Sequence, residues 1–265
     1  MTEPLTITRI THSCHLIQIG GLTVLTDPWF SERAFYHPGE PVALGVADLP
    51  ALDAVLITHH HYDHCDLAAF AAYADKDVPM IVAGPVAPRA RAAGFTSIRV
   101  LDPWEATTVK DLTVTAAPGQ HAVYEITFVV SGGGSSVYFA GDTMLIPELR
   151  TLPDRFPRFD AALLPVNGLQ IRPQLNKQVV MNAEQAAELT AVLRPRMTVP
   201  HHYAFTSGRL GDRLITKSDR DPEHFLDAAQ RIAPGSATRV LRPGEPLTIA
   251  SAQPPARPLA TSEDR

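Results

Sequence analysis

Residues 58–66 constrain this chain more than any other stretch, because they carry four histidines and two aspartates in the order THHHYDHCD. The apolar, partly β-branched segment 54–57 precedes them and predicts a buried strand. Segment 67–73 follows them and predicts a helix. Sites in α/β sheets lie on such loops, beyond the carboxyl end of a strand. The sequence therefore predicts an α/β fold with a functional loop at this point.

The spacing H-x-H-x-D-H within this loop is typical of a metal site. Alternate residues that leave a strand face the same way, so His59 and His61 can bind one ion. Asp63 and His64 begin the next turn and face a second position. Imidazole and carboxylate ligands suit Zn²⁺, Fe²⁺ or Mn²⁺, whereas Ca²⁺ and Mg²⁺ prefer oxygen ligands throughout. The alternative is a solvated polar loop, which the strand–loop–helix context disfavours.

At this motif the chain resembles the metallo-β-lactamase superfamily, whose hallmark is H-x-H-x-D-H. The resemblance implies a four-layer αββα sandwich and a hydrolytic site with one or two metals. It also implies three further ligands downstream, in the order His, Asp, His. The chain supplies His121 on a Pro-Gly loop, Asp142 in Gly-Asp-Thr and His202 in Pro-His-His, in that order.

The resemblance assigns these residues to two divalent metal ions, Zn²⁺ in preference to Mn²⁺ or Fe²⁺. The first ion is assigned to His59, His61 and His121, the second to Asp63, His64 and His202, and Asp142 bridges the two. A water shared by two cations loses a proton near neutral pH, and the resulting hydroxide attacks a carbonyl or phosphoryl centre. Asp63 is also a candidate catalytic residue that orients this hydroxide or relays a proton.

The paired histidines near the C-terminus leave a choice of register. Adjacent residues of an extended segment face opposite sides, so only one of His201 and His202 can face the metals. Pro200 is expected to end the strand that begins at Met197, which lets the second residue after it turn into the site. The family pattern P-x-H also selects His202. A register with His201 as the ligand is the alternative.

Two shorter segments resemble one branch of the superfamily, which contains the ascorbate phosphate lactonases and the N-acyl-phosphatidylethanolamine phospholipases D. The sequence THSCHL at 11–16 makes His12 a candidate close to metal or substrate, and PVNG at 165–168 makes Asn167 a candidate donor to a substrate oxygen. A structural histidine and an Asn-Gly turn are the respective alternatives. Asp27, at a strand end, either caps a turn or supports a metal ligand from behind.

Two irregular stretches are expected to form the walls of a substrate pocket. Residues 31–50 lose all periodicity, and Phe35, Tyr36 and His37 within them are candidate contacts. Residues 169–180 are a second candidate wall. A plain surface loop is the alternative for residues 31–50.

The rest of the chain is expected to complete the sandwich. Strand–helix alternation predicts parallel strands at 80–83 and 98–101 around a helix at 88–93. Two predicted strands end alike, in Asp27 and Asp142, which suggests an internal duplication of the two halves of the sandwich. Residues 240–249 are predicted to form a terminal strand pair.

The composition limits the partners and the compartment. The formal net charge of −5 gives no electrostatic footprint for nucleic acid. No apolar run approaches the roughly 18 residues that a membrane span needs. Two cysteines form no disulfide framework, and the N-terminus lacks the order of a signal peptide. We expect a cytoplasmic protein with a small-molecule substrate, and leave the possibility of a homo-oligomer open.

These observations predict one metallo-β-lactamase-like domain over residues 1–250 and a disordered tail over 251–265, which is rich in Pro, Ala and charge. The predicted function is a metal-dependent hydrolase that uses a metal-bridging hydroxide on a small soluble ester or lactone. The alternatives are a phosphodiesterase of the phospholipase D-like kind and a metal-binding protein without turnover.

Overall fold

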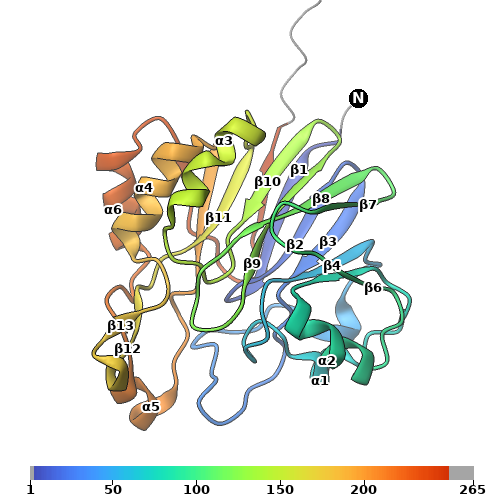
Figure 1. Ribbon diagram of the computed structural model, residues 1–265, viewed down its shortest axis with the longest axis horizontal. Helices are drawn as coiled ribbons and strands as arrows, with labels where there is room; N and C mark the ends of the chain where they lie inside the picture. The colour runs from blue at the N-terminus through green and yellow to red at the C-terminus, as the bar shows by residue number, and fades with distance from the viewer. Residues whose placement is uncertain (1–2, 251–265) are drawn as a thin grey trace, which may run out of the picture.

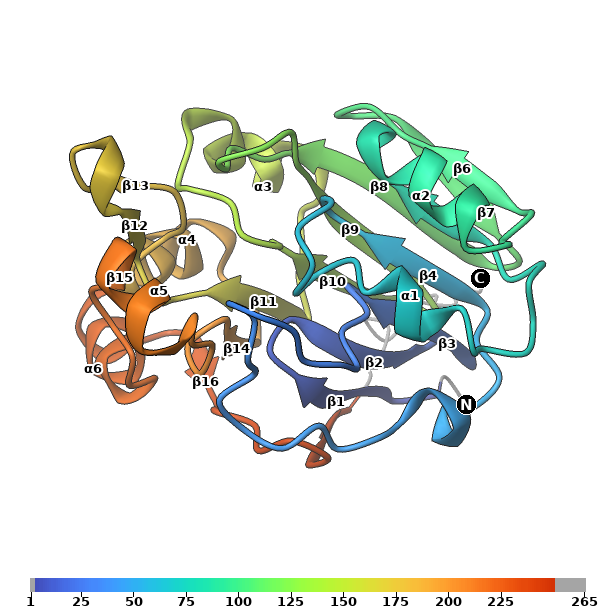
Figure 2. The same ribbon diagram turned by 90° about the horizontal axis from the view of Figure 1, so that it is seen from below.

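Two mixed β-sheets of seven strands each lie face to face, with helices on their outer sides (Figures 1 and 2). This arrangement is seen in a computed structural model, which describes residues 3–250. The predicted tail, 251–265, lies outside the described residues. The four layers confirm the predicted α/β fold, an αββα sandwich.

The first sheet begins as an antiparallel meander and continues in parallel. Its strands are, in spatial order, β17 (Pro246–Ile249), β1 (Leu5–Thr11), β2 (Cys14–Ile19), β3 (Leu22–Thr26), β4 (Ala54–Ile57), β5 (Met80–Val82) and β6 (Ile98–Val100). Strands β3 to β6 pair in parallel, which confirms the prediction from strand–helix alternation. The connections carry α1 (Leu67–Phe70), α2 (Ala87–Ala92) and the short 3-10 helices η1 (Val46–Asp48) and η2 (Gly84–Val86).

The second sheet repeats this plan. Its strands are β16 (Ala237–Thr238), β14 (Met197–His201), β11 (Ala161–Pro165), β10 (Ser135–Phe139), β9 (Ile126–Gly132), β8 (Leu112–Pro118) and β7 (Ala106–Val109). The meander runs from β7 to β10, and β10, β11, β14 and β16 are parallel. The outer helices are α3 (Leu152–Arg155), α4 (Ala183–Leu193) and α6 (Glu223–Ile232), with η3 (Pro147–Thr151) before them.

The two sheets therefore share a topology that agrees with an internal duplication. In each sheet a meander ends in one strand, β3 or β10, from which the parallel strands continue. Asp27 follows β3 directly, and Asp142 follows β10 after two residues. Each aspartate thus leaves its sheet at the equivalent strand end.

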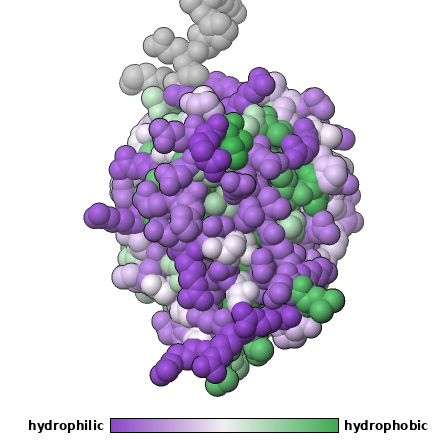
Figure 3. Space-filling model, turned by 90° about the vertical axis from the view of Figure 1, so that its left-hand side faces the viewer, coloured by the Kyte–Doolittle hydropathy of each residue, from purple (hydrophilic) through white to green (hydrophobic). Residues whose placement is uncertain are grey.

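Strand alternation divides the apolar side chains between two cores. Phe128 and Val130 of β9 point into the core between the sheets, whereas Val129 packs with Tyr138 against the outer helices. Asn182 begins α4 with a capping box, since its side chain accepts from the Gln185 amide. The face that carries α4 and α6 is mainly hydrophilic toward solvent, with small apolar patches (Figure 3). No helix within residues 3–250 is long and apolar enough to cross a membrane.

Two sequence predictions about strands are wrong. Residues 240–249 do not form a strand pair, because they contain one strand, β17, which pairs with β1 in the first sheet. Pro200 does not end its strand, because β14 continues to His201 beside β11. Since β16 pairs only with Met197 and Thr198, β14 has an open edge at Pro200, where a missing amide hydrogen is tolerated.

A small third sheet stands beside the open edge of the sandwich. It consists of β12 (Leu169–Ile171), β13 (Lys177–Gln178) and β15 (Ile215–Lys217), and adjoins η4 (Arg172–Gln174) and α5 (Gly208–Leu214). The sequence does not predict it, because its strands are two or three residues long and β12 pairs with β15 across more than 40 positions. In Figure 2 this sheet lies on the side of the second sheet, away from α1 and α2.

Candidate metal centre

The seven predicted ligand residues converge from loops at one edge of both sheets. Four of them follow β4, and the others follow β8, β10 and β14. His12, from the turn between β1 and β2, joins them. All of these side chains except that of His61 are largely buried, at positions His12, His59, Asp63, His64, His121, Asp142 and His202. The folding of both halves of the sandwich therefore creates this cluster.

Three imidazoles form the first group. The Nε2 atom of His59 lies 3.0 Å from Nδ1 of His61, and Nε2 of His121 lies 3.1 Å from the same Nδ1 atom. The three ring nitrogens thus converge as ligands of one cation do. Two of these rings face the group through Nε2 and one through Nδ1, a difference that the sequence does not reveal.

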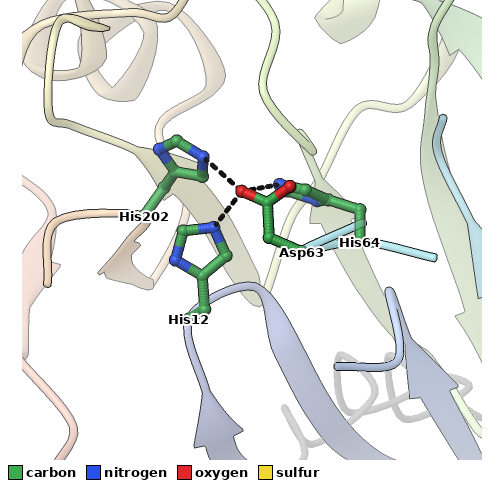
Figure 4. Close-up of side chains that lie close together, drawn as sticks. All are labelled: His12, Asp63, His64 and His202. Carbon is green, nitrogen blue, oxygen red and sulfur yellow. Dashed lines mark ion pairs between the residues drawn. The ribbon is translucent and has the colours of Figure 1, made fainter. Parts of the chain in front are cut away.

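The second group surrounds the carboxylate of Asp63 (Figure 4). Its Oδ2 atom lies 3.4 Å from Nε2 of His12, and 4.0 Å from Nε2 of both His64 and His202. These three Nε2 atoms are buried and make no hydrogen bond. Buried polar atoms without partners are rare, so these nitrogens fit the role of ligands to a cation.

Asp142 lies between the two groups. Its Oδ2 atom is 2.8 Å from Nε2 of His202, 3.2 Å from Nε2 of His64 and 3.8 Å from Nε2 of His121. The other oxygen, Oδ1, is buried without a hydrogen-bond partner. The Oδ2 atom of Asp142 therefore lies near ring nitrogens of both groups.

Residues behind the cluster orient its rings through their Nδ1 atoms. Asp27 lies 2.7 Å from Nδ1 of His64 and also accepts from the amide and hydroxyl of Thr58. The Nδ1 atom of His121 lies 2.7 Å from the carbonyl oxygen of Val179. Such contacts set the tautomer and direct Nε2 toward the site. Asp27 therefore supports a cluster residue from behind, as expected.

Glu125 is a supporting residue that the sequence analysis missed. Its Oε1 atom lies 3.2 Å from Nδ1 of His59 and accepts from the amide of Asp142 at 2.7 Å. It thus joins the motif loop to the loop after β10. The one available signal was a carboxylate placed directly before the buried strand Ile126–Gly132, four residues after His121.

His202, and not His201, faces the cluster. The ring of His201 lies behind it, with Nδ1 at 3.0 Å from Oγ of Ser13. The His202 backbone has a φ of 62°, a left-handed conformation that turns the chain as it leaves β14. The register predicted from P-x-H thus agrees with the geometry, although the strand ends one residue later than expected.

The two candidate catalytic residues from the branch resemblance lie in different surroundings. His12 packs against Trp29 and His202, with ring centroids at 5.0 and 4.2 Å, and its left-handed backbone donates an amide hydrogen bond to Glu40. Asn167 is buried away from the cavity over the cluster, and its Oδ1 atom accepts from the Leu169 amide. The turn interpretation of Asn167 therefore fits better than contact with a substrate.

Burial and charge set the protonation of the first group. Burial lowers the pKa of His61 to about 4, and lowers those of His59 and His121 as well. These rings are therefore neutral at pH 7 with lone pairs available, as metal ligands must be.

In the second group, burial and the neighbouring charges shift the pKa values in opposite directions. Burial alone would lower the pKa of His64, but Asp142, Asp27 and Asp63 raise it well above its usual value. Burial alone would raise the pKa of Asp142, but the imidazoles of His202 and His64 outweigh burial and hold this pKa well below its usual value. The carboxylates of this group thus favour positive charge, which a divalent ion would supply.

A cavity of about 350 Å³ opens over the cluster. His61, Asp63, His121, Asp142 and His202 line its floor, and apolar side chains line its walls. Both predicted wall segments contribute, through Phe35 and Tyr36 and through Leu169, Ile171 and Val179. The contact predicted for His37 is wrong, because this ring is held by Glu32 at 2.9 Å and does not line the cavity.

Fold and site together define an αββα protein with a histidine- and aspartate-rich centre at the edge of its two sheets. The chain belongs to the metallo-β-lactamase superfamily, since residues 23–203 match the family model described as a beta-lactamase superfamily domain. The comparisons confirm the predicted enzyme class, a hydrolase of this superfamily.

Several known proteins are similar to this chain. A protein of Caldivirga maquilingensis named UPF0173 metal-dependent hydrolase is 26% identical over 246 residues, which cover 90% of this chain and 95% of that protein. Among solved structures, the metallo hydrolase Igni18 from Ignicoccus hospitalis is 22% identical with a TM-score of 0.72, covering 93% of this chain and 99% of its own. An isothiocyanate hydrolase from Delia radicum gut bacteria is 21% identical with a TM-score of 0.74, covering 93% of this chain and 100% of its own. These two structures show the shared fold.

Proposed function

We propose that this protein is a metal-dependent hydrolase of a small ester or lactone. One observation carries the proposal: two groups of convergent imidazole and carboxylate donor atoms, joined by Asp142, lie at the floor of a cavity with apolar walls. The donors suit two divalent transition ions, with Zn²⁺ first and Mn²⁺ or Fe²⁺ as alternatives. His59, His61 and His121 would hold one ion, Asp63, His64 and His202 the other, and Asp142 both.

When bound, such ions lower the pKa of coordinated water to near 7 and neutralise the charge that develops on the attacked carbonyl oxygen. The chain itself supplies orientation. Asp27 and Glu125 hold the rings of His64 and His59 in place, so the ligand set is pre-organised. The apolar walls exclude bulk water from the reacting centre, which strengthens electrostatic interactions there.

Asp63 is proposed to move the proton. It lines the cavity, and although burial raises its pKa, His64 and His12 lower the pKa further and keep the carboxylate ionised. Its Oδ2 atom can accept the proton of the nucleophilic water and return it to the leaving oxygen. His12 is proposed to position Asp63, because its Nε2 atom faces Oδ2 at 3.4 Å.

The substrate class rests on the cavity and on the branch resemblance. A volume of about 350 Å³ suits a small molecule. The segment around His12 resembles that of the lactonase-containing branch, and His12 lies at the cluster. The absence of a side-chain nucleophile from this cavity floor agrees with attack by activated water.

The test combines metal analysis with a substrate panel. Protein purified without chelator should contain up to two transition-metal ions per chain, and it should hydrolyse at least one of a set of aryl esters, lactones, thioesters and phosphodiesters. Asp63→Ala and Asp142→Ala should abolish turnover, by about 10³-fold or more, while circular dichroism stays unchanged. Asp227→Ala, on the exposed face of α6, is the matched control.

Three results would contradict the proposal in different ways. A chain that binds no transition metal even after reconstitution has no such centre. Full metal content without turnover of any substrate identifies a metal-binding protein instead. Wild-type rates in both aspartate variants would place the chemistry elsewhere.

A further inference from the structure

We infer that the substrate is uncharged and presents an apolar group to the cavity walls, and that the Ser207 hydroxyl determines specificity by a hydrogen bond to a polar atom of the substrate. The inference rests on the proposed function and specifies the substrate class of the same site. It departs from the phosphorylated substrates that the resemblance to ascorbate phosphate lactonases and phospholipases D would imply. Three observations support it: the apolar walls, the positions of Arg33 and Lys217 behind these walls, and the hydroxyl of Ser207 without a partner.

The walls are apolar and come from four separate parts of the chain. Segment 31–40, the strand β12 with the residues after β13, the loop after β14 and the strand β15 each contribute. Their side chains in the cavity are Phe35, Tyr36, Leu169, Ile171, Val179, Phe205 and Ile215. An apolar group of the substrate would gain from leaving water here, whereas a charged group would lose its hydration.

No lysine or arginine among residues 3–250 lines this cavity. Two cations lie behind the aromatic walls instead. The Arg33 guanidinium is 3.9 Å from the ring centroid of Tyr62 and 4.8 Å from that of Tyr36. The Lys217 ammonium is 4.5 Å from the ring centroid of Phe205 and donates to Asp212 at 3.0 Å. A phosphate or carboxylate away from the metals would therefore meet no lysine or arginine in the cavity lining.

Among the described residues that line the cavity, Ser207 offers the one buried hydroxyl without a hydrogen-bond partner. It stands at the N-cap of α5, where a serine side chain ordinarily accepts from a helix amide. Its hydroxyl makes no such bond and Oγ has no hydrogen-bond partner, while the Ser207 amide donates to Asp212. The residue is only 2% exposed. A buried hydroxyl in an apolar wall needs a partner, and a substrate oxygen or nitrogen would provide it.

The first experiment uses a matched pair of esters and the metal-loaded enzyme. 4-Nitrophenyl butyrate and mono-4-nitrophenyl succinate differ in a terminal methyl group against a carboxylate. We expect kcat/KM to be about 100-fold higher for the butyrate. In Ile171→Lys, which places a cation in the wall at a half-buried position, this preference should shrink at least tenfold. Equal kcat/KM for the two esters in the wild-type enzyme would overturn the inference.

The second experiment concerns Ser207. Ser207→Ala should raise KM for the preferred substrate about tenfold with metal content and melting temperature unchanged, because only a bond to the substrate is lost. Ser218→Ala removes an exposed hydroxyl outside the cavity and should leave KM unchanged. An unchanged KM in Ser207→Ala, or an equal rise in both variants, would remove Ser207 from the proposal.

A binding measurement separates failure of this inference from failure of the proposed function. Hexan-2-one and 5-oxohexanoate form an unhydrolysable pair with the same difference in charge. Saturation-transfer NMR on the metal-loaded protein should detect hexan-2-one, with weaker transfer in Ile171→Lys. Binding of hexan-2-one without turnover of any ester or lactone would reject the hydrolytic function and support the neutral ligand. Turnover of esters with no preference for neutral ones would do the reverse.

Discussion

The floor and the walls of the cavity were assembled in different ways. The floor comes from loops that end strands of the two large sheets, and its rings are held from behind by Asp27, Glu125 and backbone carbonyls. The walls come from irregular segments and the small third sheet, and they contact substrate space mainly through apolar side chains. The scaffold determines the floor, where the proposed chemistry takes place, and the insertions between strands determine the walls, which would select the substrate.

The largest expected effect concerns which of two adjacent histidines belongs to the floor. His202→Ala should lower metal content by about one ion per chain and cut kcat by orders of magnitude, since it removes a proposed ligand. His201→Ala is the matched control, because its ring lies behind the site against Ser13 and should leave both ions in place. Metal analysis and kinetics decide the matter. Loss of metal in His201→Ala alone would reverse the register.

A smaller effect is expected from the support of the floor. Asp27→Asn keeps the shape but weakens the contact at 2.7 Å to Nδ1 of His64. Metal affinity should fall by about 10- to 100-fold, with wild-type kcat regained at saturating metal. Competition with a chelating dye gives the affinity. Unaltered affinity would show that Asp27 serves only its hydrogen bonds with Thr58.

A change in the walls should alter substrate preference and leave metal content constant, whereas a change in the floor should alter metal content. Phe35→Ala removes a half-exposed side chain from the cavity wall without touching the floor. We expect relative kcat/KM values for short and long acyl esters to change by about tenfold while metal content stays constant. A loss of metal with unchanged substrate preference would break the separation between floor and walls.

Outside the cavity, an effect on acid stability is expected, with no change in activity at neutral pH. Burial, and less so Arg9, lowers the pKa of His15 to about 3, so the ring takes up a proton more readily in the unfolded chain. Stability from this residue is complete above pH 6.5 and falls as the pH drops toward 3, by up to about 1.4 kcal/mol per pH unit. Urea unfolding of chelated protein should show a shallower acid decline in His15→Gln than in wild type. Parallel curves would mean that the pKa of His15 is the same in the folded and the unfolded chain.

Local sequence patterns predicted much of the fold and, through the family resemblance, most of the floor. The motif from His59 to His64 is a local signal, and the resemblance that it carries assigned His121, Asp142 and His202 after later strands. Strand alternation and the capping box at Asn182 are equally local, and the structure has the corresponding elements. These features depend on backbone periodicity and donor chemistry, both of which are written in neighbouring residues.

The sequence by itself determined which donor atoms the chain could bring to a site, and in what order along the strands. Only the tertiary structure decided that His12 faces Asp63, that Glu125 stands behind His59, and that Ser207 keeps a free hydroxyl in the wall. It also decided the strand partners of residues 237–249 and the pairing of β12 with β15. Each of the contacts of His12, Glu125, β12 and β17 joins residues tens to hundreds of positions apart. Periodicity carries no information about such contacts, because they depend on how the sheets and insertions pack together.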